Sequence, residues 1–326
     1  VCKTKAPAQW SLAFGLPRFK RRLGCCCHGA LGRDHEQVAR ASAADGRPTA
    51  DHLLCRLQSA DLRFGAIGGP FVIVWLTPLR NAMTNGAQDG GASFRELFQR
   101  SFGFPSPSAA ASLRIAYTGS LTSAPASCPQ WCMIGPAFHI FNSQFPTPVA
   151  LLATASLETL ITYSSQSRSA QMAYNVQSPK AAVPLFSIFK LWGPGACFVV
   201  LRNFCGMSGI RWFSPPLQQV MKPVLPSGTH EIAADMTASM LTCCVSAPLN
   251  SCWTYTVLTP ALWDMPVTQR VEALLGFLRS QYLDESGSRL SRLAARDVGI
   301  RCVYISCCFT MFSSIERLAV AYWPKG

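Results

Sequence analysis

Prolines interrupt the long apolar runs of this chain, which contains 23 of them among 326 residues. Because a proline donates no backbone hydrogen bond and fixes its own φ angle, it is expected at helix ends and sheet edges. The apolar run 71–76 is bracketed by Pro70 and Pro78 and is rich in β-branched and aromatic residues, which predicts a short buried strand. From 104 to 148 the prolines are so dense that we expect neither long helices nor central strands.

These interruptions predict a mixed fold, made mainly of short α-helices with a few strands and extensive irregular segments rich in proline, glycine and serine. Two local helix starts stand out. Ser93 with Glu96, and Ser313 with Glu316, have the spacing of capping boxes, and the second is expected to open the last helix. Since such signals alternate with long inconsistent stretches, an alternative is that the chain has no stable globular fold.

Composition divides the chain into four parts. Residues 1–33 form a basic, cysteine-containing tail, and 34–103 are interpreted as a small α/β unit with a helix capped by Thr49. Residues 104–182 are interpreted as a proline- and serine-rich connector with one helix at 149–163. Residues 183–326 form an apolar region that ends in a helical hairpin at 267–297 and a C-terminal helix.

Charged side chains are scarce, at 14% of residues against about 25% in ordinary soluble domains. The net charge of +13 reflects missing acids more than abundant bases, and Glu158 is the sole acidic residue between Leu97 and His230. The bases of that stretch are spaced far apart, whereas a nucleic-acid footprint needs them clustered on one face. We therefore predict no specific nucleic-acid partner, and only weak attraction to anionic membranes or other polyanions.

No segment meets the requirement for a membrane-spanning helix, which is about 20 mostly apolar residues. Residues 236–263 carry no charge but include two prolines and many polar side chains, and the apolar runs 64–79 and 302–315 are short. Peripheral or partial insertion stays open, because apolar runs and positive charge both favour an anionic membrane.

The N-terminal stretch does not fit a secretory signal peptide, because the apolar run 10–16 is followed by basic residues where small ones should stand. The lack of acids before Asp34 is faintly similar to a mitochondrial transit peptide, and the basic run 18–22 to a nuclear signal. We favour a solvated basic tail over both.

The 15 cysteines are odd in number and irregular in spacing, which favours reduced thiols in an intracellular compartment over a disulfide scaffold. Cys128 and Cys132, with His139 nearby, come nearest to a metal site. A structural zinc site needs four ligands and the sequence offers no fourth, so these three are weak candidates. We predict no metal and no cofactor.

No catalytic motif is complete. Ser208 stands one residue away from the spacing of a nucleophile elbow, and His230 with Glu231 lacks the second histidine of a zinc-protease helix. We favour an orphan or non-selected reading-frame product without evolved activity, and expect no enzyme and no catalytic residues. The alternatives are a basic membrane-associated or interaction protein, and an enzyme whose site is assembled from residues distant in sequence.

Overall fold

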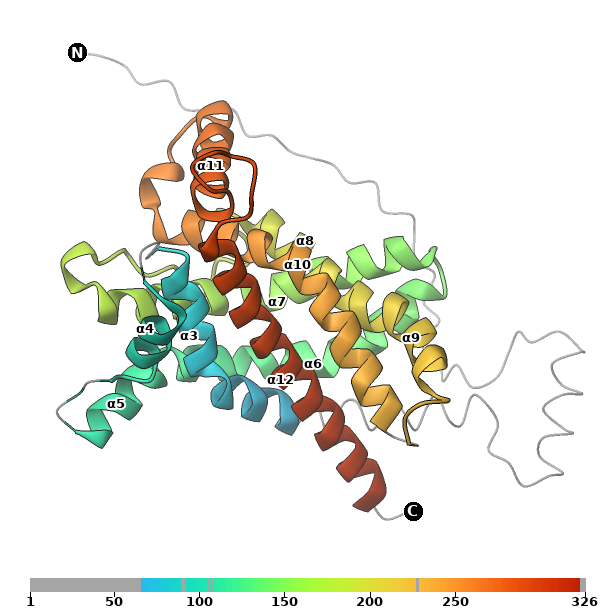
Figure 1. Cartoon of the computed structure of the whole chain (residues 1–326). Helices are drawn as coiled ribbons and strands as arrows, with labels where there is room; N and C mark the ends of the chain where they lie inside the picture. The colour runs from blue at the N-terminus through green and yellow to red at the C-terminus, as the bar shows by residue number, and fades with distance from the viewer. Residues whose placement is uncertain (1–65, 89–91, 105, 107, 227–228, 323–326) are drawn as a thin grey trace, which may run out of the picture. The chain divides into compact units, whose positions relative to one another are not determined.

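A computed structural model describes residues 66–88, 92–104, 106, 108–226 and 229–322 (Figure 1). These residues belong to a compact unit that spans Leu54–Gly326. Of residues 66–308, 78% are helical, and the described part contains no strand, so the predicted mixture of short helices and strands is wrong. The basic tail predicted at 1–33 and the helix predicted after Thr49 lie outside the described residues.

Four long helices dominate: α6 (Ser120–Asn142), α7 (Thr147–Gln177), α10 (Thr229–Leu258) and α12 (Arg292–Tyr322). Shorter helices lie between them: α3 (Thr77–Gly86), α4 (Phe94–Ser101), α5 (Ala109–Ala116), α8 (Ala196–Ser208), α9 (Ser214–Met221) and α11 (Val267–Tyr282). A further helix, Ala66–Trp75, precedes α3. The connections include η1 (Pro179–Ala181), the π-helical η2 (Gly209–Phe213) and η3 (Pro260–Leu262).

The run 71–76, predicted as a strand, is helical up to Trp75 and leads into α3. Val72 and Leu76 lie four residues apart on one helical face, and both belong to a buried cluster with Tyr304 of α12. The β-branched residues favour a strand only where neighbouring strands offer a pleated surface to pack on. The described part offers none, and packing against α12 decides the helical state instead.

Helix α6 contains Pro125, Pro129 and Pro136, so the expectation that prolines exclude long helices from 104–148 is wrong. A proline inside a helix costs about 3 kcal/mol, because it removes one backbone hydrogen bond and crowds the preceding turn. Burial offsets this cost. Phe138 of α6 packs into a cluster with Leu151 of α7 and with side chains of α8.

Helix α7 is twice as long as the helix predicted at 149–163, because it continues through the serine-rich stretch that follows. The serines there do not face solvent as linker residues would. Ser165 is buried and its hydroxyl donates to the Thr162 carbonyl at 2.9 Å, and buried Ser169 donates to the Gly119 carbonyl at 3.0 Å. The polar side chains of α7 therefore belong to the interior.

The capping box at α4 is confirmed. The backbone N–H of Ser93 donates to Glu96 Oε2 at 2.7 Å, and the N–H of Glu96 donates to Ser93 Oγ at 3.3 Å. The second box is wrong as a helix start, because α12 already begins at Arg292 and runs through Ser313. Ser291 caps it instead, accepting from the N–H of Ala294 at 3.0 Å.

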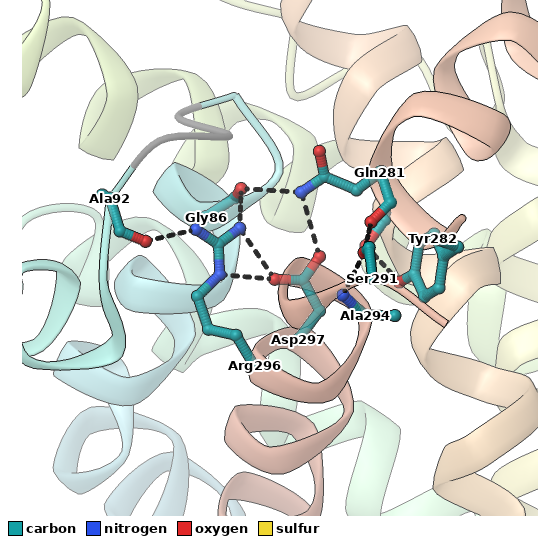
Figure 2. A network of polar contacts seen from close by, with 9 residues as sticks. Gly86, Ala92, Gln281, Tyr282, Ser291, Ala294, Arg296 and Asp297 are labelled. Atoms are coloured by element: carbon teal, nitrogen blue, oxygen red, sulfur yellow. Dashed lines mark hydrogen bonds and ion pairs between the residues drawn. The ribbon is translucent and has the colours of Figure 1, made fainter. Parts of the chain in front are cut away.

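A polar clamp joins the ends of α3, α11 and α12 (Figure 2). We define it as Gly86, Ala92, Gln281, Arg296 and Asp297. Arg296 donates to the carbonyls of Gly86 at 2.6 Å and Ala92 at 2.7 Å, and pairs with Asp297 at 3.0 Å. Gln281 donates to the Gly86 carbonyl and to Asp297 Oδ2, both at 3.3 Å. The clamp ties segments about 200 residues apart in sequence.

Candidate functional site

Helices α7 and α10 bury many polar side chains, next to apolar ones such as Leu151 and Trp253, and expose several apolar side chains. The buried side chains of α7 include Thr154, Thr159, Thr162, Ser167 and Gln171, and those of α10 include Ser239, Thr242, Ser246, Asn250 and Thr254. The exposed side chains of the same two helices include Val149, Leu152, Leu160, Val176, Met240, Leu241 and Val245. A water-soluble helical bundle keeps its polar side chains mostly outside and its apolar stripe toward the core, so the buried polar and exposed apolar side chains here depart from that pattern.

Several charged side chains of the helices are buried as well. Helices α6, α7 and α8 together contain three residues with formal charge, Glu158, Arg168 and Arg202. Glu158 is 9% exposed and Arg202 is 7% exposed, and on α12 Arg301 is also 7% exposed. Burying a charge costs several kcal/mol unless a partner of opposite charge or strong hydrogen bonds compensate it. Such residues are therefore unexpected in a core that has only a structural role.

These charged side chains line one cavity of about 490 Å³. Helix α7 contacts α3, α6 and α8, while α10 contacts α8 and α12, and α12 contacts α3, so the helices close around the cavity. Each of the six contributes lining side chains. The volume falls in the range of about 300–1,000 Å³ that is typical of small-molecule sites.

Arg202 of α8 lies in a web of neutral acceptors. Its guanidinium donates to Asn250 Oδ1 at 2.9 Å, to Gln166 Oε1 at 2.8 Å and to Asn203 Oδ1 at 3.0 Å. It also lies over the ring of Trp253, 5.2 Å from its centroid. Amide oxygens orient the guanidinium and satisfy its donors, but they supply no compensating negative charge.

Arg301 and Arg80 approach the same cavity from α12 and α3. Arg301 lies over the Tyr304 ring at 5.8 Å, and its Nη1 has the weak acceptor Met83 Sδ at 4.0 Å. Its Nε is buried and has no acceptor among the described residues. The half-buried Arg80 donates to Ser169 Oγ at 2.7 Å. Within the described part, no carboxylate lies at ion-pairing distance from Arg80, Arg202 or Arg301.

The carboxylate of Glu158 interacts electrostatically with two of these arginines, Arg202 and Arg301. Its Oε1 accepts a hydrogen bond from Gln130 Nε2 of α6 at 2.7 Å. The other carboxylate that lines the cavity, Asp235, is half-buried and accepts from the Ser214 hydroxyl. Arg80, Arg202, Arg211 and Arg301 outnumber these two carboxylates, so the cavity carries a net positive charge.

The cavity opens to the outside beside two of its lining residues, His139 and Arg211, because both are exposed. Asn250 and Arg301 of the cavity also line a second, much smaller pocket, whose lining includes Asp297 of the polar clamp.

The candidate metal ligands do not converge. Cys128 and Cys132 lie one turn apart on α6 and their thiols hydrogen-bond to each other. His139 lies on the same helix, about 10 Å further along its axis, and belongs to the cavity opening. Within the residues that the structure describes, no three histidine, cysteine or carboxylate side chains are grouped closely enough to hold a metal ion.

No protein-family model matches this chain, and no curated protein is significantly similar to it. Among the described helices, α10 is the one that is long and apolar enough to cross a membrane by length and composition. Only 33% of its most apolar stretch is buried within the protein. The core helix of a soluble protein would be mostly buried, so α10 presents an apolar outer surface.

Sequence reasoning had noted Glu158 as an isolated acid but had not identified Arg80, Arg202 or Arg301 as site residues. A usable signal was present. Arg80 and Arg202 are each the sole charged residue of a short helix, α3 and α8, whereas Arg301 follows Arg296 and Asp297 on α12 and carries no such signal. A single charged residue in an otherwise uncharged helix indicates that its side chain has a role in the interior of the fold.

Proposed function

We propose that the protein is a membrane-embedded helical protein whose central cavity binds a small anion. The observation that carries the proposal is the group of three arginines, Arg80, Arg202 and Arg301, around one cavity without an ion-pair partner among the described residues. Buried arginines that lack carboxylate partners are a favourable environment for an anion, since their guanidinium groups bind carboxylate and phosphate oxygens in pairs.

Two buried donors beside the cavity lack an acceptor. Arg301 Nε and Trp253 Nε1 belong to cavity-lining residues and have no acceptor among the described residues. An unsatisfied buried donor costs about 1–3 kcal/mol, so the polar groups around the cavity are not fully satisfied within the described part of the protein. The lining tryptophans Trp131 and Trp253 add apolar surface, so the cavity can also accommodate the carbon atoms of a small organic anion.

The membrane part of the proposal rests on the buried polar and exposed apolar side chains of the helices. Helices α6, α7, α10 and α12 contain 23, 31, 30 and 31 residues, which is long enough to cross the apolar part of a bilayer, and among the described helices α10 is also apolar enough to do so. In a bilayer, charged side chains face the interior of a bundle and mark solute pathways, while apolar side chains face lipid. Glu158, Arg202 and Arg301 follow this rule.

Thermal unfolding of the purified full chain in detergent tests the anion site. Sulfate and succinate should raise the unfolding temperature in a saturable way, because a ligand that binds only the folded state stabilises it. Chloride at the same ionic strength should have little effect. Arg202→Gln and Arg301→Gln should remove the response, whereas Arg114→Gln, which changes an exposed arginine on α5, should keep it.

The competing functions predict different results in the same experiment. A chain without evolved activity should unfold without a cooperative transition and without selectivity among anions. The proposal is rejected if chloride stabilises as strongly as sulfate, or if the response survives both cavity substitutions. Binding alone requires no catalysis, so the expectation that the protein is not an enzyme stays part of the proposal.

A further inference from the structure

Glu158 occupies an unusual place for a carboxylate in an anion site. It is buried, it lines the cavity, and its charge interacts with those of Arg202 and Arg301 without forming a direct ion pair with either. Gln130 of α6 donates to its Oε1 at 2.7 Å and holds the carboxylate in place. Glu158 is therefore an internal counter-ion, positioned at a distance from the arginines that it partly neutralises.

A fixed negative charge inside the cavity opposes the entry of any anion. Two like charges a few ångströms apart repel by several kcal/mol at the effective dielectric constant of a protein interior. The same carboxylate, once protonated, becomes a neutral hydrogen-bond donor that an anion can accept from. Its protonation therefore removes a repulsive interaction and adds an attractive one.

We propose that Glu158 couples anion binding to proton uptake: the anion enters when the Glu158 carboxylate takes a proton from solution, and the proton leaves with the anion. This inference rests on the proposed anion site and assigns its regulation. The step is balanced, because one proton from water joins one carboxylate oxygen and no other bond changes. Affinity for an anion should consequently rise as the pH falls.

Other titratable and charged groups share the cavity and must be separated from Glu158. They are Arg80 on α3, His139 on α6, Arg202 on α8, Arg211 in η2, Asp235 on α10, and Arg301, Tyr304 and Cys308 on α12. The arginines stay charged across the physiological range. His139 and Asp235 are the two groups besides Glu158 whose protonation at lower pH would also favour an anion.

Equilibrium binding of radiolabelled sulfate to the full chain tests the inference, because the charge of sulfate is constant in this pH range. The wild type should bind sulfate about tenfold more tightly at about pH 6 than at about pH 8. Glu158→Gln retains an oxygen that accepts from Gln130, and it should bind about tenfold more tightly than the wild type at about pH 8, with no dependence on pH. His139→Gln and Asp235→Asn should keep the pH dependence of the wild type.

A second measurement needs no variant. Calorimetric titration of sulfate into the wild type, in two buffers of different ionisation enthalpy, should show the uptake of close to one proton per bound sulfate at about pH 8. The inference is overturned if the Glu158→Gln variant binds sulfate no more tightly than the wild type, keeps its pH dependence, or if binding takes up no proton. If the wild type and all variants bind no sulfate, the anion site itself is rejected.

Discussion

Gly69 shows how single residues determine the packing around the cavity. A Cβ atom built on Gly69 would lie 2.2 Å from Cδ1 of the Trp131 side chain and 2.9 Å from the carbonyl oxygen of Ser127. Real Cβ atoms do not approach other heavy atoms so closely, so the helix Ala66–Trp75 can lie against α6 at this point only with a glycine.

Gly69→Ala should destabilise the protein by about 1–3 kcal/mol, because the added methyl group forces α6 or the Trp131 ring to move. Gly276→Ala on α11 is the matched control, since nothing lies within 4 Å of its Cβ position. That change should stabilise the protein by about 0.5–1 kcal/mol through helix propensity. Thermal unfolding of the two variants in detergent gives the comparison, and equal effects would show that the close helix contact is absent.

The polar clamp allows a second test at the residue scale. Arg296→Met should cost about 3–5 kcal/mol, because it leaves the buried Asp297 carboxylate without its counter-ion and the Ala92 carbonyl without its donor, and only Gln281 then donates to Asp297 and Gly86. Adding Asp297→Leu should recover part of this loss, since the unpaired buried charge is then gone. Chemical unfolding of the single and double variants measures the coupling. A strictly additive double variant would contradict a cooperative clamp.

Asp284, in the turn between α11 and α12, should make the stability of the protein depend on pH. The Ser286 hydroxyl donates to Asp284 Oδ1 at 2.7 Å, and with the backbone N–H groups of Ser288 and Arg289 it lowers the pKa of this exposed carboxyl. A lowered pKa in the folded state means that the stabilisation is complete above the ordinary aspartate pKa and is lost as the pH falls through the lowered value.

Asp284→Ala should therefore lower the unfolding temperature at neutral pH, and the difference from the wild type should shrink toward zero below about pH 4. Thermal scans of both proteins over a series of acidic buffers measure this difference. A difference that stays constant down to the lowest pH would show that the carboxylate does not stabilise the turn.

At the scale of the elements, the exposed apolar side chains of the helices allow a test of whether their outer surface faces water or lipid. Leu241 is 61% exposed near the middle of α10, and Leu113 is 59% exposed on the short helix α5. In water, placing an arginine at either exposed position changes stability by no more than about 0.5 kcal/mol. At the centre of a bilayer the same change costs about 2.5–3.5 kcal/mol.

Leu241→Arg should accordingly reduce the amount of folded protein recovered from membranes severalfold, whereas Leu113→Arg should leave it unchanged. Membrane fractionation followed by size-exclusion chromatography of the solubilised protein measures both. If the two variants behave alike, the outer surface of α10 does not face lipid.

The burial of polar side chains in these helices explains which elements could be predicted from the sequence and which could not. The start of α4 was readable because Ser93 and Glu96 satisfy each other within one turn, without help from the rest of the fold. The second half of α7 and all of α6 were not. Reading serines as linker residues and prolines as helix breakers assumes that water surrounds a helix, while here Ser165 lines the cavity and Ser169 donates to the Gly119 carbonyl at the start of α6. The convergence of Arg80, Glu158, Arg202 and Arg301 depends on helix packing, which local patterns do not report.

At the scale of the described unit, α3, α6, α7, α8, α10 and α12 enclose a positively charged cavity that is open beside His139. Figure 1 shows α10 and α12 side by side along one wall. Lipid should surround the outer surface of these helices, and cysteine labelling can show which parts of that surface lipid protects from water. Cys244 in α10 and Cys197 at the start of α8 are both exposed thiols.

In permeabilised membranes, a water-soluble maleimide should modify Cys197 and leave Cys244 unmodified, because the middle of α10 lies in the apolar part of the bilayer. Both thiols should react after solubilisation and denaturation. Mass spectrometry of the labelled peptides distinguishes the two sites, and rapid labelling of Cys244 in intact membranes would place that surface in water.

The most direct measurement is an experimental structure of the full chain crystallised with selenate, a heavier analogue of sulfate that anomalous scattering can locate. The proposed anion site predicts a single dominant anomalous peak in the central cavity, with selenate oxygens within hydrogen-bonding distance of Arg202 and Arg301. A cavity that holds no selenate, or arginines that instead pair with carboxylates of the protein, would contradict the claim that the cavity binds an anion.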